Sequence, residues 1–272
     1  MVGNFGMVDV AAARFIVFGA VAGVAIAMRP ALRRWPNGRQ AAAALALSVL
    51  GFTGYYVLLA FAIEASGTAV PSLIIGTIPV WMMLLGRPAG LTLRALALTA
   101  AGIGLMVGAA WPQAGGQAAG GAGFAWGMLL ALLAMASWTA FGLLNAAWLR
   151  RHPEVHAADW ANWLGIATGL GAAMLWLLAG SGHQELRAQP NGGLFLLLAL
   201  AGGIGSSWLA TVLWNVASQR LSASLCGQLI VSETLFALLY AFVWDGRWPL
   251  ATEWVAALLF VLGILASIKA HR

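Results

Sequence analysis

The sequence predicts an all-α polytopic membrane protein, and three observations support this fold class. Hydrophobic residues make up 62% of the 272 residues and charged residues only 8%, whereas an ordinary soluble domain is about 25% charged. Apolar runs of roughly twenty residues recur along the chain, and each is long enough to cross about 30 Å of hydrocarbon. Most basic residues lie in the short gaps between alternate runs, which is typical of topology signals.

Nine apolar segments predict nine membrane-spanning helices. We expect the first to be a membrane span and not a signal peptide, because no basic leader precedes it and it contains Arg14. A glycine-rich connector, PQAGGQAAGGAG, separates the fourth segment from the fifth, and the connectors are too short to hold a soluble domain. The expected spans are, approximately, 9–29, 40–64, 68–86, 92–111, 124–149, 159–180, 193–217, 222–244 and 249–268.

The basic residues also predict how the chain is oriented in the membrane. Eleven of them lie in alternate gaps and the C-terminal tail, and only two lie in the other gaps. Because positive residues stay in the cytoplasm, the first span is expected to begin outside and the C-terminus to be cytoplasmic. The same distribution accounts for the net charge of +6, so no nucleic-acid partner is expected.

The two halves of the chain resemble one another. Residues 51–86 align with residues 205–240 at a constant offset of 154, and Gly51 falls on Gly205. Matched spans are five apart, and because five is odd the halves are expected to have opposite orientations. Inverted repeats of about five helices are typical of secondary transporters, with the substrate site near the midplane.

Small residues spaced four apart predict close helix packing at matched places in the two halves, because such residues share one helix face. The matched pairs are Gly19 and Gly23 with Gly165 and Gly169, and Gly104 and Gly108 with Gly263 and Ser267.

The repeat divides the chain into a first half, residues 1–111, and a second half, residues 124–272. The fifth span has no mate, so the first half lacks the span that would open it. A mate is expected upstream of Met1, in which case the start is internal to a longer natural protein. The alternative is a nine-span form of the protein.

Four segments carry a resemblance to a known family. They are AAARFIVFG in the first span, SLIIGTIPVWMMLLG in the third, LLAMASWTAFGLL in the fifth and LIVSETLFALLY in the eighth. On these segments the chain resembles the drug/metabolite transporter superfamily, EamA-type. The resemblance implies ten spans in two inverted five-span repeats. Members commonly carry proline after the acid at the position of Glu233, where this chain has Thr234.

Two charged residues lie deeper inside their predicted spans than any other, and a charge there is expensive and usually functional or paired. Glu233 lies near the middle of the eighth span. One hypothesis is functional: Glu233 carries a proton or contacts a cationic group of the substrate. The other is that Glu233 is a structural carboxylate. Arg14 lies about one and a half turns from the outer end of the first span. It is a possible charge partner of Glu233, or it extends to the outer interface.

Polar and aromatic residues form stripes along several predicted helices. Amides and hydroxyls need protein partners in lipid, so they either line a substrate pathway or join helices by hydrogen bonds. Pro71 and Pro79 predict a bend in the third span. The candidate pathway residues, besides Glu233, are Trp138, Asn145, Thr211, Asn215, Gln228, Ser232, Thr77, Tyr55 and Tyr56.

Sequence motifs for enzymes and cofactor sites are missing. The chain has no phosphate-binding loop, and GGIGSSW at 202–208 lacks the third glycine of a dinucleotide fingerprint. The four histidines lie in connectors or the tail, and there is one cysteine. We therefore expect no catalytic residues, no cofactor and no metal site.

Together these features favour a secondary transporter of the bacterial inner membrane. It is expected to move a small organic metabolite, amino-acid-like or drug-like, by alternating access and in the direction of efflux. Its expected partners are the small-molecule substrate, the lipid bilayer and protons, and it is expected to be a monomer or a weak homodimer. The alternative is a non-transporting membrane subunit or a lipid-handling protein of the same fold.

Overall fold

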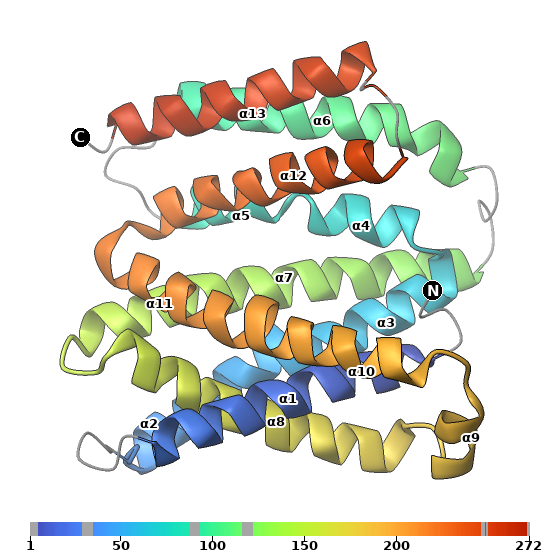
Figure 1. Ribbon diagram of the computed structural model, residues 1–272. Helices are drawn as coiled ribbons and strands as arrows, with labels where there is room; N and C mark the ends of the chain where they lie inside the picture. Colours follow the sequence, from blue (N-terminus) through green and yellow to red (C-terminus); the bar gives the residue numbers. More distant parts are fainter. Residues whose placement is uncertain are drawn as a thin grey trace. The chain divides into compact units, whose positions relative to one another are not determined.

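The computed structural model describes residues 5–28, 35–86, 93–115, 122–245, 248 and 250–270, and these form helices and no strands (Figure 1). The predicted all-α class is confirmed. In chain order the elements are α1 (Met7–Ala27), α2 (Gly38–Ser48), the π-helix η2 (Val49–Thr53), α3 (Gly54–Ser66), α4 (Ala69–Ile75), α5 (Ile78–Leu85), α6 (Leu93–Gly115), α7 (Ala122–Arg151), α8 (Ala157–Ala179), α9 (His183–Ala188), α10 (Gly192–Ala201), the π-helix η3 (Gly202–Leu209), α11 (Ala210–Arg220), α12 (Ala223–Asp245) and α13 (Ala251–Ala270).

Helices occur at all nine predicted spans. In the described part of the chain, six continuous helical segments are long and apolar enough to cross a membrane, and Val70–Leu85 and Leu93–Met106 are shorter apolar helices. This agrees with a polytopic membrane protein. Helix α9, outside these spans, is a single short helix between α8 and α10.

The chain forms two compact units. Unit 1 contains Met1–Ala60 and Leu144–Arg220, and unit 2 contains Phe61–Leu143 and Leu221–Arg272. Helices α3 and α7 contribute residues to both units. Each unit therefore combines spans from both predicted halves of the sequence.

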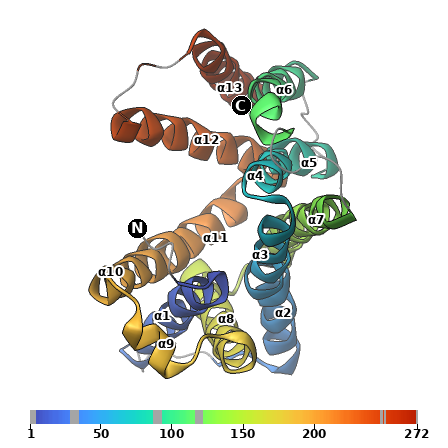
Figure 2. The same cartoon turned by 90° about the vertical axis from the view of Figure 1, so that its right-hand side faces the viewer.

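The core of unit 1 is built on the crossing of α1 and α8, which lie side by side in Figures 1 and 2. A Cβ added to Gly19 would lie 2.8 Å from the Cα of Gly169, and one added to Gly165 would lie 2.7 Å from the Phe18 ring. Gly19, Gly165 and Gly169 therefore let the helices approach as the sequence predicts. Gly23 does not take part, because an added Cβ there would have no heavy atom within 4 Å.

In unit 2, α6 packs along α13 through Gly263, as the sequence predicts, and through Gly102, which it does not predict. An added Cβ at Gly102 would lie 2.6 Å from the Phe260 ring, and one at Gly263 would lie 2.6 Å from Thr99 Oγ1. The expectation for Gly104 and Gly108 is wrong, since neither has a neighbour within 4 Å of such a Cβ. Gly104 follows Gly102 by two residues, about 200° around the helix, and so it faces away from α13.

Spans matched by the repeat pack against each other in antiparallel directions. In unit 2, the α5 residue Met82 lies at Gly227 of α12, and the later Gly86 lies at the earlier Ser224. In unit 1, α1 and α8 run in the same antiparallel way, because Ala22 lies at Gly165 and the carbonyl of Phe15 lies at Gly169. This is the direction that an inverted repeat requires of its matched spans.

The two π-helical segments fall at matched positions of the repeat. Shifting η2, Val49–Thr53, by the offset of 154 places all of it within η3, Gly202–Leu209. Short π-helical segments inside α-helices are frequent at functional sites, because the extra residue loosens the backbone hydrogen-bond ladder.

The predicted bend in the third span is a break between α4 and α5. Thr77 precedes α5, its Oγ1 donates to the Ile74 carbonyl at 2.7 Å, and Pro79 lies in the first turn of α5. Proline is tolerated there because first-turn N–H groups have no partner within the helix.

We predict that Gly19→Ala destabilises the protein and that Gly23→Ala does not. The new methyl group at position 19 would meet the backbone of Gly169, which cannot rotate away, so a loss of about 1–3 kcal/mol in unfolding free energy is expected. Thermal unfolding in detergent or lipid nanodiscs measures the difference. Equal melting temperatures for the two variants would contradict the packing of α1 on α8.

Candidate functional site

Arg14 of α1 is held by groups from two other elements of unit 1. Its Nε donates a hydrogen bond to Ser207 Oγ at 2.8 Å, its Nη1 donates to the Tyr56 hydroxyl, and its Nη2 donates to the Ser206 carbonyl at 3.4 Å. Tyr56 belongs to α3, and both serines belong to η3. We call Arg14, Tyr56, Ser206 and Ser207 the Arg14 cluster.

Gly203 lets η3 approach the backbone of α1 at Arg14, and Gly202 lies at ordinary van der Waals distance from the Arg14 side chain. A Cβ added to Gly203 would lie 2.8 Å from the Arg14 carbonyl oxygen, and one added to Gly202 would lie 3.5 Å from Arg14 Cδ. The guanidinium carbon lies 5.5 Å from the Phe15 ring centroid and 5.4 Å from that of Tyr56. Aromatic faces at this distance attract a cation, and here they stabilise the guanidinium away from water.

The alternative in which Arg14 extends to the outer interface stays a prediction. Phe5 stacks on Phe195 at a centroid distance of 4.1 Å, so the starts of α1 and α10 lie at a similar level. By helical rise, Ser207 then lies further from this level than Arg14 does. The Arg14 guanidinium is thus held by a hydroxyl that lies further from these helix starts than Arg14 does. Its pairing with Glu233 stays a prediction, because the two residues belong to different units.

A second polar group in unit 1 joins three helices. Asn145 Nδ2 of α7 donates to Asn215 Oδ1 of α11 at 2.9 Å, and Trp160 Nε1 of α8 donates to Asn145 Oδ1 at 2.7 Å. All three side chains are fully buried. We call these three residues the amide cluster. Both asparagines make hydrogen bonds that join helices, which is the alternative to lining a substrate pathway.

Unit 2 contains a similar pair between α12 and α6. Gln228 is fully buried, and its Nε2 donates to Thr99 Oγ1 at 2.8 Å. Two other candidates bond within their own span. Ser232 Oγ donates to the Leu229 carbonyl at 2.6 Å, and Thr77 Oγ1 donates to the Ile74 carbonyl and lies 3.1 Å from Met135 Sδ.

Glu233 lies on α12, and its side chain is exposed on unit 2. Two positions earlier on α12, Val231 is fully buried against Ala256 and Phe260. Two residues span about 200° of a helix, which places Glu233 on the opposite face from this cluster. Its place in a substrate pathway stays a prediction.

The remaining candidates do not meet in one described site. Thr211 is buried in unit 1, Tyr55 packs edge to face on Tyr56 at 5.5 Å, and in unit 2 Trp138 lies 6.2 Å from Phe141. Of the predicted residues, Arg14 and Tyr56 come together in one cluster and Asn145 and Asn215 in another.

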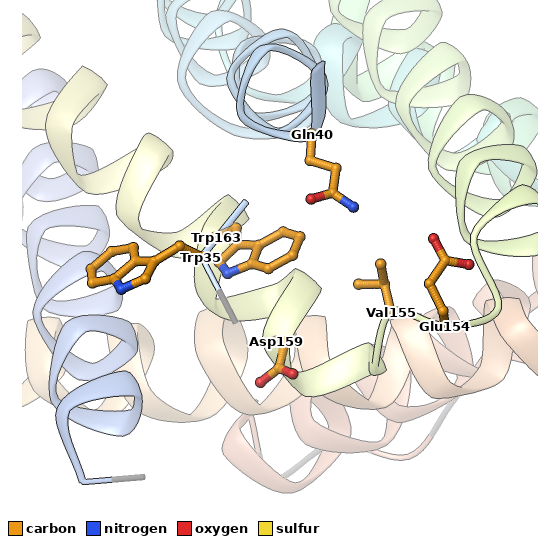
Figure 3. Close-up of a pocket in the computed structure, with 6 residues that line it drawn as sticks. All are labelled: Trp35, Gln40, Glu154, Val155, Asp159 and Trp163. Carbon is orange, nitrogen blue, oxygen red and sulfur yellow. The ribbon is translucent and has the colours of Figure 1, made fainter. Parts of the chain in front are cut away.

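A pocket of about 280 Å³ lies where α2 and α8 begin in unit 1. Figure 3 shows the Gln40 amide, the Trp163 ring and Val155 around it, with Glu154 on the connector before α8. Trp163 is buried and Glu154 is exposed. By the predicted orientation this pocket faces the cytoplasm. Its lining residues are Trp35, Gln40, Glu154, Val155, Asp159 and Trp163.

Sequence reasoning missed Ser206, Ser207 and this pocket. The run GGIGSSW is no nucleotide fingerprint, but its small residues let η3 approach α1, and that signal could have indicated a helix contact. The connector RRHPEVH is an improbable zinc site because of its proline, yet it supplies Glu154 and Val155 to the pocket. In the described part of the chain, no group of three metal-ligating side chains is found.

Comparison with known proteins gives three findings. Residues 125–268 match the EamA-like transporter family. The chain is 34% identical over 242 residues to the "Inner membrane protein YtfF" of Escherichia coli (strain K12), covering 84% of this chain and 75% of that protein. A solved structure described only as "Crystal structure of protein" has a TM-score of 0.76 and 20% identity, covering 98% of this chain and 89% of the other. That structural likeness concerns the fold.

We predict that Asn145→Leu and Asn215→Leu each destabilise the protein by about 1 kcal/mol, because each leaves a buried amide without its partner. The double variant should lose less stability than the sum of the two single losses. In it both asparagines are replaced by leucine, so neither amide is left buried without the other. Unfolding of the four proteins by denaturant in detergent measures this coupling.

Ser232→Ala provides the control, because the Ser232 hydroxyl donates to a carbonyl of its own helix and joins no second helix through that bond. This variant should unfold like the wild type. Strictly additive losses for Asn145 and Asn215 would show that their amides do not interact in the membrane protein.

Proposed function

Since the chain belongs to the EamA-like transporter family, we propose that it is a secondary transporter that moves a small organic metabolite across the bacterial inner membrane. The location rests on its apolar helices and on the name of the relative from Escherichia coli. We further propose export as the direction and alternating access as the mechanism, in which the substrate site opens to one side of the membrane at a time.

One observation carries this proposal beyond the family match. The Arg14 cluster brings a cationic side chain and hydroxyl groups together from three segments, each long and apolar enough to span the membrane. Charged side chains at such positions are expensive and mark substrate or ion pathways. In a membrane protein without a substrate or ion pathway, an apolar residue at position 14 would give the more stable fold.

The exposed Glu233 supplies a candidate for coupling to protons. It is an exposed carboxylate on α12 of unit 2. We propose that protonation of Glu233 accompanies transport. The alternative source of energy is the metabolite's own gradient.

The proposed orientation predicts that the C-terminus is cytoplasmic. A fluorescent protein fused after residue 272 should therefore fluoresce, and an alkaline phosphatase fusion at the same place should be inactive, because phosphatase folds only outside the cytoplasm. A fusion of each reporter in the 181–191 connector should give the reverse pattern. An active phosphatase at the C-terminus would contradict the orientation.

We predict that purified protein in liposomes releases one or more metabolites from a loaded mixture of amino acids, organic acids and amines. Release should be faster than from protein-free liposomes and should respond to an imposed proton gradient. The Glu233→Gln variant should still release the metabolite down its own gradient but should lose the response to the proton gradient, because the amide does not titrate. Mass spectrometry of the external solution measures each compound.

Glu64→Gln is the matched control, since Glu64 is another exposed carboxylate of unit 2 and lies near the end of α3. It should keep the wild-type response. A normal response in Glu233→Gln would remove Glu233 from the coupling. Release no faster than from protein-free liposomes, for every compound, would favour a non-transporting membrane protein of the same fold.

A further inference from the structure

We propose that the Arg14 cluster binds the carboxylate group of the transported metabolite, so that the substrate is a monocarboxylate with an apolar portion. This inference rests on the proposed transport function. It names the chemical class of the substrate and the residue that recognises it.

The first reason is that the charge of Arg14 is not neutralised by the groups that hold it. Its hydrogen-bond acceptors are the Tyr56 hydroxyl, the Ser207 hydroxyl and the Ser206 carbonyl, and all three are neutral. A guanidinium carries five N–H donors, and these three hydrogen bonds leave two of them over. The remaining donors and the full positive charge can serve a ligand.

The second reason is the position of the charge. Arg14 lies seven residues after the first residue of α1, so by helical rise it lies about 10 Å along this helix. Such a depth falls within a hydrocarbon layer of about 30 Å. A net charge there is unfavourable, and a bound anion would offset it.

The third reason concerns the charge and shape of the anion. A guanidinium fork matches a planar carboxylate, to which it can donate two parallel hydrogen bonds. One arginine balances one negative charge. The described hydrogen bonds and ring contacts of the cluster bring no second basic side chain, so a doubly charged phosphate ester would retain an unbalanced charge.

Aromatic side chains next to the cluster account for the apolar portion. The Phe15 and Tyr56 rings meet edge to face at 4.9 Å, and Phe52 and Trp208 pack against the same hydrophobic cluster. Rings around a single charged group give the usual composition of a small-molecule site, namely apolar walls with a few polar contacts. Because Arg14 is only partly buried, its guanidinium is not enclosed by these rings.

The alternative is that Arg14 only ties α1 to α3 and η3. The test loads proteoliposomes with hydroxy- and amino-monocarboxylates, each accompanied by its primary carboxamide, and with phosphate monoesters of the same size. Release is followed by mass spectrometry, with protein-free liposomes as the blank. Wild-type protein should release the carboxylate of at least one pair about tenfold or more faster than its carboxamide, as expected for a hydrogen bond between charged groups.

Arg14→Gln should bring this ratio close to one, because the amide keeps hydrogen bonding but not the charge. Arg14→Lys should keep a carboxylate preference at a lower rate, since a point charge replaces the planar fork. Arg150→Gln removes one positive charge from the exposed end of α7 and should behave as wild type. Size-exclusion chromatography and thermal unfolding establish that each variant is folded.

If Arg14→Gln does not fold, Arg14→Lys decides the question, and an unchanged rate and preference in that variant would overturn the proposal. A folded Arg14→Gln that keeps the wild-type preference would also overturn it, as would faster release of phosphate esters by the wild type. Transport of several compounds without any carboxylate preference would refute the carboxylate site but leave the transport function standing. No transport of any compound would refute both.

Discussion

The absence of hydrogen-bonding solvent inside a bilayer is the constraint on which the rest of this structure depends. Lipid offers no partner to an amide, a hydroxyl or a guanidinium, so leaving such a group unpaired in a span costs free energy. Asn145 finds Asn215 and Trp160, and Gln228 finds Thr99. These contacts join helices that are far apart in the sequence. Polar side chains therefore specify which apolar helices pack together, where hydrophobicity alone would not distinguish them.

Glycine supplies the complementary part of the packing. Apolar helices in lipid gain nothing by hiding from the solvent, so close van der Waals contact has to hold them together. Gly19 and Gly169 bring the backbones of α1 and α8 together in unit 1, and Gly102 accommodates the Phe260 ring in unit 2. Gly203 brings η3 against α1 beside Arg14. The same close packing that builds the fold thus places the serines of η3 within reach of the guanidinium.

The sequence predicts the helical segments well because the length of an apolar run is a direct record of the membrane's thickness. It also indicates Gly19 and the break in the third span, since glycine spacing and proline act locally. The rotation of each helix about its axis is harder to predict in a chain that is apolar on most faces. For this reason the sequence assigns Gly104 to a contact that Gly102 makes. The Arg14 cluster joins residues up to 193 positions apart, which no local pattern contains.

Arg14 differs from the other polar groups because neutral partners satisfy its hydrogen bonds but not its charge. The most direct measurement is an experimental density map of the protein in lipid nanodiscs, with and without a monocarboxylate that it transports. We expect the Arg14 guanidinium to lie beside the Tyr56 and Ser207 hydroxyls in both maps, with added density next to the guanidinium when the monocarboxylate is present. A guanidinium extended to the lipid headgroups, or the monocarboxylate bound away from Arg14, would contradict this expectation.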